Sequence, residues 1–207
     1  MKKSLIVAAF AAVCCCSNEA NAAVERSWAW SPIGLGLCAP VQIPFATSDV
    51  YGFRFGGLYG NHVDVYGLDV GLVEYQENFV GCQVAAVGWA SGTATGLQVS
   101  LASIDMAAFT GFQIAALNWD NADSVGVQFA VANANQSDFT GWAAGALNAS
   151  LNFTGFQFGV FNLADDLTGL QLGVVNATQR LNGLQVGLLN LVCESKLPIM
   201  VIANAGF

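Results

Sequence analysis

The sequence predicts an all-β fold built from tandem repeats, and three observations support this prediction. A phrase of glycine, apolar residue, usually glutamine, then apolar residue recurs ten times between Gly52 and Asn190. The step between successive opening glycines is always 14 or 15 residues. The alternation within the phrase has the period of two that is typical of a half-buried β-strand. A helix is disfavoured because each internal glycine costs it about 1 kcal/mol.

We number each repeat from its opening glycine as position 1. The ten units begin at Gly52, Gly67, Gly81, Gly96, Gly111, Gly126, Gly141, Gly155, Gly169 and Gly183. Modules of a fixed short period bury their inner faces by stacking on their neighbours. Most of the chain is therefore expected to be one repetitive scaffold.

Before the repeats, residues 1–22 resemble a secretory signal peptide. Lys2 and Lys3 precede an apolar stretch, and the segment closes on an A-x-A cleavage pattern at 20–22. We therefore expect an exported protein at the outer membrane or cell surface, with a periplasmic location as the alternative. Three consecutive cysteines at 14–16 raise a lipid-anchored alternative, although Val13 stands where a small residue is expected. Residues 23–49 are expected to form a lead or cap segment.

Residues 50–192 hold the ten-unit β-repeat domain. Positions 2 and 4 are apolar in all ten units, and position 3 is Gln in seven. We expect positions 2 and 4, including Cys82 and Trp142, to face the core. In a solenoid the glutamines then face outward, so that Gln171→Lys is tolerated, whereas a narrow barrel lumen resists that change.

The second part of each unit indicates a corner. Position 5 is always small, position 7 is apolar, and position 8 is Asn in the last six units. Positions 4 and 7 cannot share a face of one straight strand, so a corner is expected near position 5. Stacked Asn and Gln side chains are expected to form amide ladders. The clearest structural positions are Gly155, Gln157, Gly159, Asn162, Gly169, Gln171, Gly173, Asn176, Gly183, Gln185, Gly187 and Asn190.

Two architectures fit units of this length. In a parallel β-solenoid each unit is one coil, and equivalent residues stack about 4.8 Å apart. In an up-and-down outer-membrane β-barrel each unit is one strand and one turn. We favour the solenoid because every unit carries the same phrase in the same order, whereas a barrel has a natural period of two strands. Residues 193–207 form either a C-terminal cap or a closing strand, and the cap is favoured.

Charge and composition limit the classes of partner. The chain has 6 Lys and Arg against 14 Asp and Glu, and no Lys or Arg lies between Arg54 and Arg180. Nucleic-acid binding is excluded because it needs a cationic surface. Acids such as Asp120, Asp123 and Asp138 lie between units, where we expect them to be solvated. The uncharged remainder predicts contact with an envelope polymer, a membrane, a partner or other copies of the chain.

No pattern for catalysis or for a small-molecule substrate is evident. The only histidine, His62, lies in a loop, and Asp165 and Asp166 are neighbours that a strand points to opposite faces. Phosphate-binding and metal-binding motifs are absent, so we expect no catalytic, cofactor or metal site. Trp89 and Trp119 are candidate sugar-stacking residues, although ordinary turn packing is favoured.

The cysteine count leaves the redox state open. Removal of the signal peptide leaves Cys38, Cys82 and Cys193, and an odd number of cysteines cannot pair fully within one chain. Cys82 is expected to be a small core residue. A bridge between Cys38 and Cys193 has no support from spacing.

The repeat phrase resembles a group of bacterial surface-repeat proteins. The resemblance rests on tandem units such as GFQFGVFN, GLQLGVVN and GLQVGLLN, followed by a Leu-Pro-Ile segment and an Asn-x-Gly-Phe end. It covers roughly residues 50–207. Proteins of that group are exported or surface-exposed and have no characterised activity, so the resemblance implies a location and no functional residue. The expected function is a non-catalytic structural or adhesive scaffold, with an integral outer-membrane barrel as the alternative.

Overall fold

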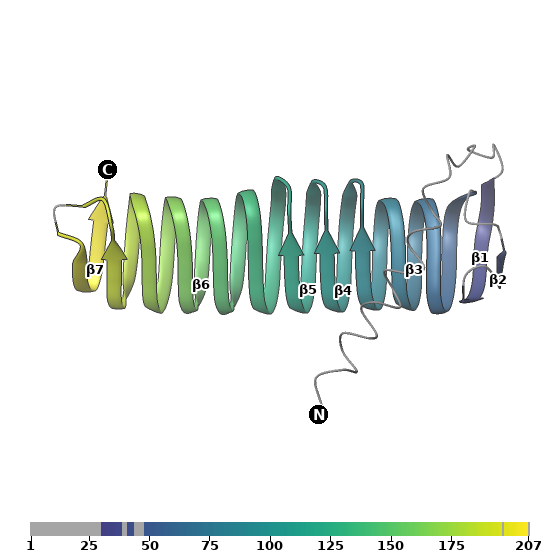
Figure 1. Cartoon of the computed structure of the whole chain (residues 1–207), viewed down its shortest axis with the longest axis horizontal. Coiled ribbons are helices and arrows are strands. Elements are labelled where there is room, and N and C mark those ends of the chain that lie inside the picture. Colours follow the sequence, from purple (N-terminus) through teal and green to yellow (C-terminus); the bar gives the residue numbers. More distant parts are fainter. Residues whose placement is uncertain (1–29, 39–40, 44–47, 196, 207) are drawn as a thin grey trace, which may run out of the picture.

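The chain folds as a parallel β-solenoid, in which successive repeats stack as coils along one axis (Figure 1). The computed structural model describes residues 30–38, 41–43, 48–195 and 197–206. Neighbouring coils pair in parallel and in register, with Gly81 opposite Gly96 and Gln83 opposite Gln98. The predicted all-β class and solenoid are confirmed. The alternative of an up-and-down barrel is wrong, because such a barrel pairs its neighbouring strands antiparallel.

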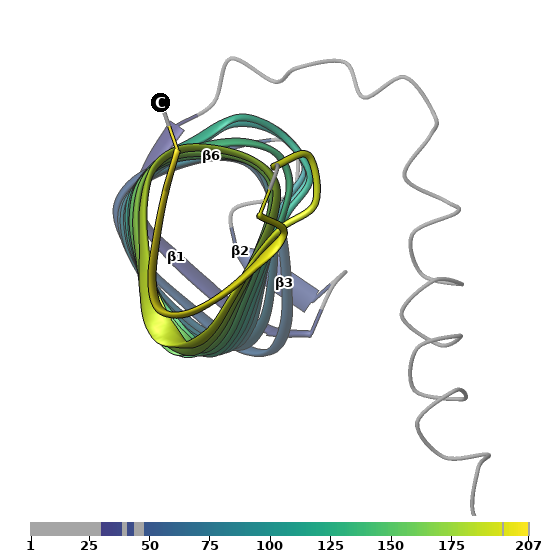
Figure 2. The same ribbon diagram turned by 90° about the vertical axis from the view of Figure 1, so that its left-hand side faces the viewer.

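Seven strands make one continuous sheet in the order β2-β1-β3-β4-β5-β6-β7. They are β1 (Trp30–Cys38), β2 (Val41–Ile43), β3 (Asp49–Ala90), β4 (Ala94–Asp105), β5 (Phe109–Asp120), β6 (Ser124–Val192) and β7 (Ile199–Gly206). Strands β3 and β6 run through several coils without interruption, whereas β4 and β5 make one coil each. Viewed along the axis, the coils superimpose as one closed outline (Figure 2).

A column of glycines fixes the path of the backbone at position 1. All ten opening glycines have φ between 130° and 152°, a region that side chains rarely adopt. A Cβ added to Gly111 falls 2.0 Å from the carbonyl oxygen of Gly96, and the same contact recurs from coil to coil. Glycine is therefore required at this position by backbone angle and by the close approach of the next coil.

The polarity of the two strand faces is the reverse of the sequence prediction. The position 3 glutamines point inward and are at most 2% exposed, whereas Trp142 at position 2 is 63% exposed. Cys82 is half-buried on the outer side. The expectation that positions 2 and 4 face the core was wrong, and so was the expectation that Gln171 faces outward. Period-two alternation separates two faces without saying which one is enclosed, and a stacked interior lets amides satisfy one another.

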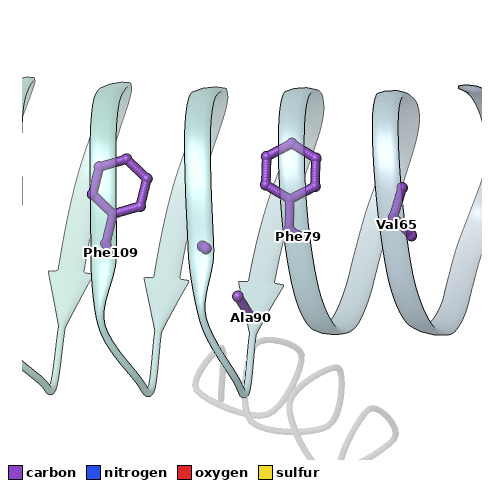
Figure 3. Packing of buried hydrophobic residues seen from close by; sticks show 5 residues of the cluster. Val65, Phe79, Ala90 and Phe109 are labelled. Atoms are coloured by element: carbon purple, nitrogen blue, oxygen red, sulfur yellow. The ribbon is translucent and has the colours of Figure 1, made fainter. Parts of the chain in front are cut away.

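The largest apolar side chains of the interior form a column two residues before the opening glycines. The buried side chains there include Val65, Phe79, Phe109, Phe139 and Phe153. Figure 3 shows Val65 and Phe79 in neighbouring coils and Phe109 farther along the same column, with Ala90 on a neighbouring wall. The rings of Phe139 and Phe153 stack with centroids 5.3 Å apart. This column supplies the hydrophobic core of an otherwise polar interior.

The predicted corner follows the small residue at position 5. Val160 and Phe161, at positions 6 and 7 of one unit, are 42% and 48% exposed although they are adjacent. Consecutive outward side chains break the alternation of a straight strand, so the chain turns here. Positions 3, 8 and 10 are the enclosed positions on either side of this corner.

Different strands close the two ends of the coil stack. Strand β7 pairs antiparallel with the last coil, placing Asn204 opposite Gln185. At the other end β1 pairs in parallel with the first coil and β2 pairs antiparallel with β1. Strand β7 therefore lies on the last coil as a cap does. The predicted signal peptide, residues 1–22, lies outside the described residues.

Candidate functional site

The interior of the coil stack holds most of the chemically active side chains. Its C-terminal part contains an Asn ladder, formed by Asn118, Asn133, Asn148, Asn162, Asn176 and Asn190 at position 8. Each amide donates to the next one, at 2.8 Å from Asn148 Nδ2 to Asn162 Oδ1. The same Nδ2 donates to the carbonyl oxygen of Phe158 at 3.0 Å. The predicted ladder therefore exists, and it also satisfies the position 4 carbonyl beside the corner.

A Gln ladder at position 3 runs in the opposite direction. Gln185 Nε2 donates to Gln171 Oε1 at 2.8 Å, and Gln171 Nε2 donates to Gln157 Oε1 at 2.7 Å. A second segment joins Gln128, Gln113 and Gln98. Ala143 occupies the position between the two segments and interrupts them. Because a buried amide needs hydrogen-bond partners, these ladders give the glutamines a structural role.

Buried charged groups replace the amides in the first two coils. Arg54 at position 3 pairs with Asp69 at 3.3 Å (Nε to Oδ1) and also contacts Glu74. All three side chains are at most 1% exposed. Burial raises the pKa of Asp69, and the positive charge of Arg54 opposes that shift. Gln76 also donates to Asp69. We call Arg54, Asp69, Glu74 and Gln76 the charged plug.

His62 lies inside the stack beside the charged plug. It is 3% exposed, and its Nδ1 lies 3.5 Å from the carbonyl oxygen of Ser48. Burial and, second, the charge of Arg54 lower its pKa to about 4. The imidazole is therefore neutral at physiological pH. His62 lies in β3 and not in the loop that the sequence suggested.

Two carboxyl groups lie in consecutive coils in the middle of the stack. Asp105 and Asp120 are fully buried at position 10. The Nε2 atom of Gln113 lies 2.5 Å from Asp105 Oδ2 and 3.2 Å from Asp120 Oδ1. Burial, together with the neighbouring Asp120, raises the pKa of Asp105 to about 8. Burial raises the pKa of Asp120 to about 6, against hydrogen bonds from Gln113, Ser124 and Gln128.

The location of Asp120 corrects the expectation that the acids between units are solvated. Asp120 is enclosed, whereas Asp123, Asp138 and Asp165 are exposed. The exposed acids belong to what we call the polar corner, which comprises the residues between position 10 and the buried apolar column of each coil. Neighbouring corners are joined by side-chain contacts such as Asn152 Nδ2 to Asp138 Oδ1 at 2.6 Å. The polar corner is a solvated ridge along the stack.

The rest of the outer surface is uncharged and mostly apolar, apart from an exposed row of residues, most often Thr, just before the opening glycines. We define the first apolar face as positions 2 and 4, and the second apolar face as positions 6, 7 and 9. No residue at these five positions in the ten units is charged. Exposed members include Phe112 and Phe158 on the first face, and Leu101, Val131 and Leu188 on the second. Every charged residue of 50–195 lies either inside the stack or in the polar corner.

The two candidate sugar-stacking tryptophans occupy the second apolar face. Trp89 is half-buried and lies edge-on to Tyr75, with centroids 6.1 Å apart. Trp119 is 38% exposed and its Nε1 donates to Asn121 Oδ1 at 2.8 Å. Neither ring forms a paired platform with the other, and both take part in local packing. Trp142, excluded as a core residue by the sequence, is the most exposed of the three.

The described residues show no conventional catalytic or metal constellation. No group of three or more His, Cys, Asp and Glu side chains among them is arranged to hold a metal ion. Cys82 is half-buried and Cys193 is exposed. The Cys38 side chain lies outside the described part of the chain. The described part of the chain contains no helix that is long and apolar enough to cross a membrane.

Sequence reasoning found the repeat positions and missed which of them are enclosed. The twelve predicted structural positions all lie in β6, with Gln157, Gln171 and Gln185 on one inner wall and Asn162, Asn176 and Asn190 on another. The charged plug was missed, although Arg54 and Asp69 stand at the position that Gln occupies elsewhere. The available signal was a charged residue at position 3, where seven of the later units carry Gln.

Comparison with known proteins adds no relative. No family model, no curated protein and no solved structure matches the chain.

Proposed function

We propose that this protein is an exported, non-catalytic scaffold of a bacterial cell envelope, which acts through its repetitive outer surface. The observation that carries the proposal is the different chemistry of the inner and outer side chains of the coil stack. The buried polar side chains of the later coils bond mainly to one another, and the outer faces present the same uncharged side chains coil after coil. Such a surface suits extended contact with another surface, whereas binding one small ligand calls for a concave site.

Export is supported by the signal-like residues 1–22 and by the resemblance of the repeat to surface-repeat proteins. The scarcity of charge on the outer faces also supports a location in contact with other envelope material, because a free soluble protein exposes about 25–35% charged surface residues. The alternative of a pore-forming barrel is not retained, because the fold is a solenoid.

Fractionation of a Gram-negative host that expresses the full chain tests this proposal. We expect the protein in the envelope fraction, processed at the signal segment, and accessible to protease added to intact cells if it is displayed outside. A matched variant lacking residues 2–22 is expected to stay in the cytoplasm. Recovery of the full chain in the cytoplasm, unprocessed and equal to the deletion variant, contradicts export.

A further inference from the structure

We infer that the two apolar faces are covered by the hydrocarbon of a lipid bilayer, in which the coil stack lies flat with its polar corner in water. The inference deepens the proposed function by naming the surface that the scaffold contacts. It commits to lipid acyl chains as the occupant. It does not need the protein to be exported, because the contact depends on the folded coils alone.

The first argument is the extent of the apolar surface. The two faces together cover positions 2, 4, 6, 7 and 9 of every coil. They meet at the turn of the backbone that follows position 5. Val131 on one face is 64% exposed and Trp142 on the other is 63% exposed. A monomeric soluble protein rarely exposes contiguous apolar patches above a few hundred Å². One flat interface with a second copy covers one face and leaves the other in water, whereas a deformable hydrocarbon phase covers both.

The second argument is the state of the backbone. Each coil hydrogen-bonds to the coil before and the coil after, as the parallel register of β3, β4, β5 and β6 shows. The corner carbonyls of Phe158, Leu172 and Val186 accept from the Asn ladder. Hydrocarbon tolerates a backbone only when its polar groups are satisfied internally. The flanks of the stack meet this requirement, whereas the two end strands keep a free edge.

The third argument is the placement of charge, which sets the orientation. The charges outside the interior run along the polar corner from Asp64 in the first coil to Glu194 in the last. Ten coils at about 4.8 Å each extend roughly 48 Å, which exceeds the hydrocarbon thickness of about 30 Å. A stack standing upright therefore places several of these charges within the hydrocarbon, where charge is costly. Lying flat, the corner stays in water and both faces reach the acyl chains.

The same distribution predicts the character of the binding. The polar corner is mainly acidic, and Arg180 at the corner is paired with Asp166. Attraction to anionic headgroups needs clustered Lys and Arg, which the polar corner lacks. Binding to the bilayer is therefore apolar, proceeds on zwitterionic lipid, and is insensitive to salt.

Vesicle flotation of the full chain tests the inference. The chain is synthesised without cells in the presence of phosphatidylcholine vesicles and floated at about 0.1 M and 1 M NaCl, on either side of the salt range in which exposed charges become screened. We expect flotation in both. A face variant carries Val131→Glu, Trp142→Glu and Leu188→Glu, all on exposed outer positions, and we expect its partition coefficient to fall at least about a hundredfold. Residues 1–22 are common to all variants, so the difference reports on the coils.

A matched variant adds the same charge to the polar corner. It carries Gln136→Glu, Asn152→Glu and Gln179→Glu, which lie at exposed corner positions. We expect its partition coefficient to stay within about twofold of the parent, because these side chains remain in water. Circular dichroism and protease resistance show whether both variants keep the coil. A folded face variant that floats like the parent overturns the inference. If the face variant loses its β signal while the corner variant keeps it, a milder variant with Leu101→Gln and Trp142→Gln takes its place, and equal flotation of that folded variant and the parent also overturns the inference.

Orientation has a separate readout in tryptophan quenching by lipids brominated on their acyl chains. Trp142 lies on the first apolar face, whereas Trp119, at position 9, lies at the edge of the second apolar face beside the polar corner. We expect Trp142→Phe to remove more of the quenching than Trp119→Phe. The reverse order overturns the flat orientation. Failure of the parent to float, with a large assembly that the face variant dissolves, identifies a second copy as the occupant and overturns the lipid assignment without touching the proposal of export.

Discussion

The two halves of the coil stack share one backbone and differ in what they enclose. The coils before Asn121 bury six ionisable side chains, namely Arg54, His62, Asp69, Glu74, Asp105 and Asp120. The described coils from Ser124 onward bury none, and their inner polar positions hold Gln, Asn, Ser and Thr. Register and the glycine column continue unchanged across the boundary.

This difference shows that the backbone sets the shape of the coil, whereas the interior side chains set how the stability of the coil responds to pH and to substitution. A neutral amide both donates and accepts, so identical amides satisfy one another from coil to coil. A carboxylate only accepts, and it must find a donor, a cation or a proton. The N-terminal half is therefore expected to respond to pH and to loss of single charges. The C-terminal half is expected to respond mainly to interruption of its ladders.

The largest expected effect is a loss of stability that is similar in both halves. Gly111→Ala and Gly169→Ala each place a Cβ within 2.1 Å of the preceding glycine's carbonyl oxygen, at φ of 142° and 135°. We expect each to lower the free energy of unfolding by about 3–5 kcal/mol, measured by urea denaturation. Thr168→Ala, at an exposed neighbouring position, is the control. A large loss at only one of the two glycines contradicts a shared backbone requirement.

A charge placed in the neutral half tests the difference directly. Gln171 is fully buried between Gln157 and Gln185, and Lys offers no acceptor to Gln185. We expect Gln171→Lys to lower the free energy of unfolding by about 3–5 kcal/mol. Val174→Lys places the same charge on an outer position that is 42% exposed and is expected to be folded in detergent. Equal stability of Gln171→Lys and the parent contradicts an enclosed glutamine column.

Removal of the only cation in the charged plug tests the same difference in the N-terminal half. Arg54→Met leaves Asp69 and Glu74 buried without their positive partner. We expect a loss of about 3 kcal/mol at pH 8 and a smaller loss at pH 5, where protonation removes the unpaired charge. Chemical denaturation at both pH values measures the difference. Phe55→Met, at a 48% exposed position of the same coil, is the control.

The acid pair is expected to make stability fall as pH rises. The pKa of Asp105 is raised from 3.8 to about 8 by burial, so the folded chain keeps a proton that the unfolded chain releases near pH 4. The stabilising contribution is full below about pH 4 and is lost as pH rises toward 8. We expect Asp105→Asn to flatten this dependence and to raise the free energy of unfolding at pH 8 by about 1–3 kcal/mol.

The reciprocal change in the neutral half is the control for the acid pair. Asn135 occupies the same inner column as Asp105 and Asp120, and it is 5% exposed. Asn135→Asp is expected to strengthen the loss of stability between pH 4 and 8. A parent protein whose melting temperature is flat over that range contradicts the burial of these carboxyl groups.

The smallest expected effect lies on the polar corner. Arg180 and Asp166 pair across neighbouring coils, and the Arg180 side chain is 63% exposed. The guanidinium lowers the pKa of Asp166 through a hydrogen bond. We expect Asp166→Ala to leave the melting temperature unchanged within error, because exposed pairs are screened by solvent. A clear drop indicates that the corner carries stability as well as charge.

Most of the fold was predictable from the sequence because its signal is repeated ten times. The period of 14–15 residues, the common order of residues in each unit and the small residue before the corner all favoured coils over antiparallel strands, and the parallel register confirms it. The Asn ladder was also predictable, since identical amides that stack in register can donate to one another.

The inward face was decided only by the tertiary structure. Alternation of Leu170, Gln171 and Leu172 defines two sides of a strand, and general experience assigns the apolar side to the interior. The closed coil encloses Gln171 instead, because stacking gives its amide a donor and an acceptor in the neighbouring coils. The sequence determined the period, the corner and the glycine column through backbone sterics. Which side of the strand is enclosed depended on partners that exist only once the coils stack.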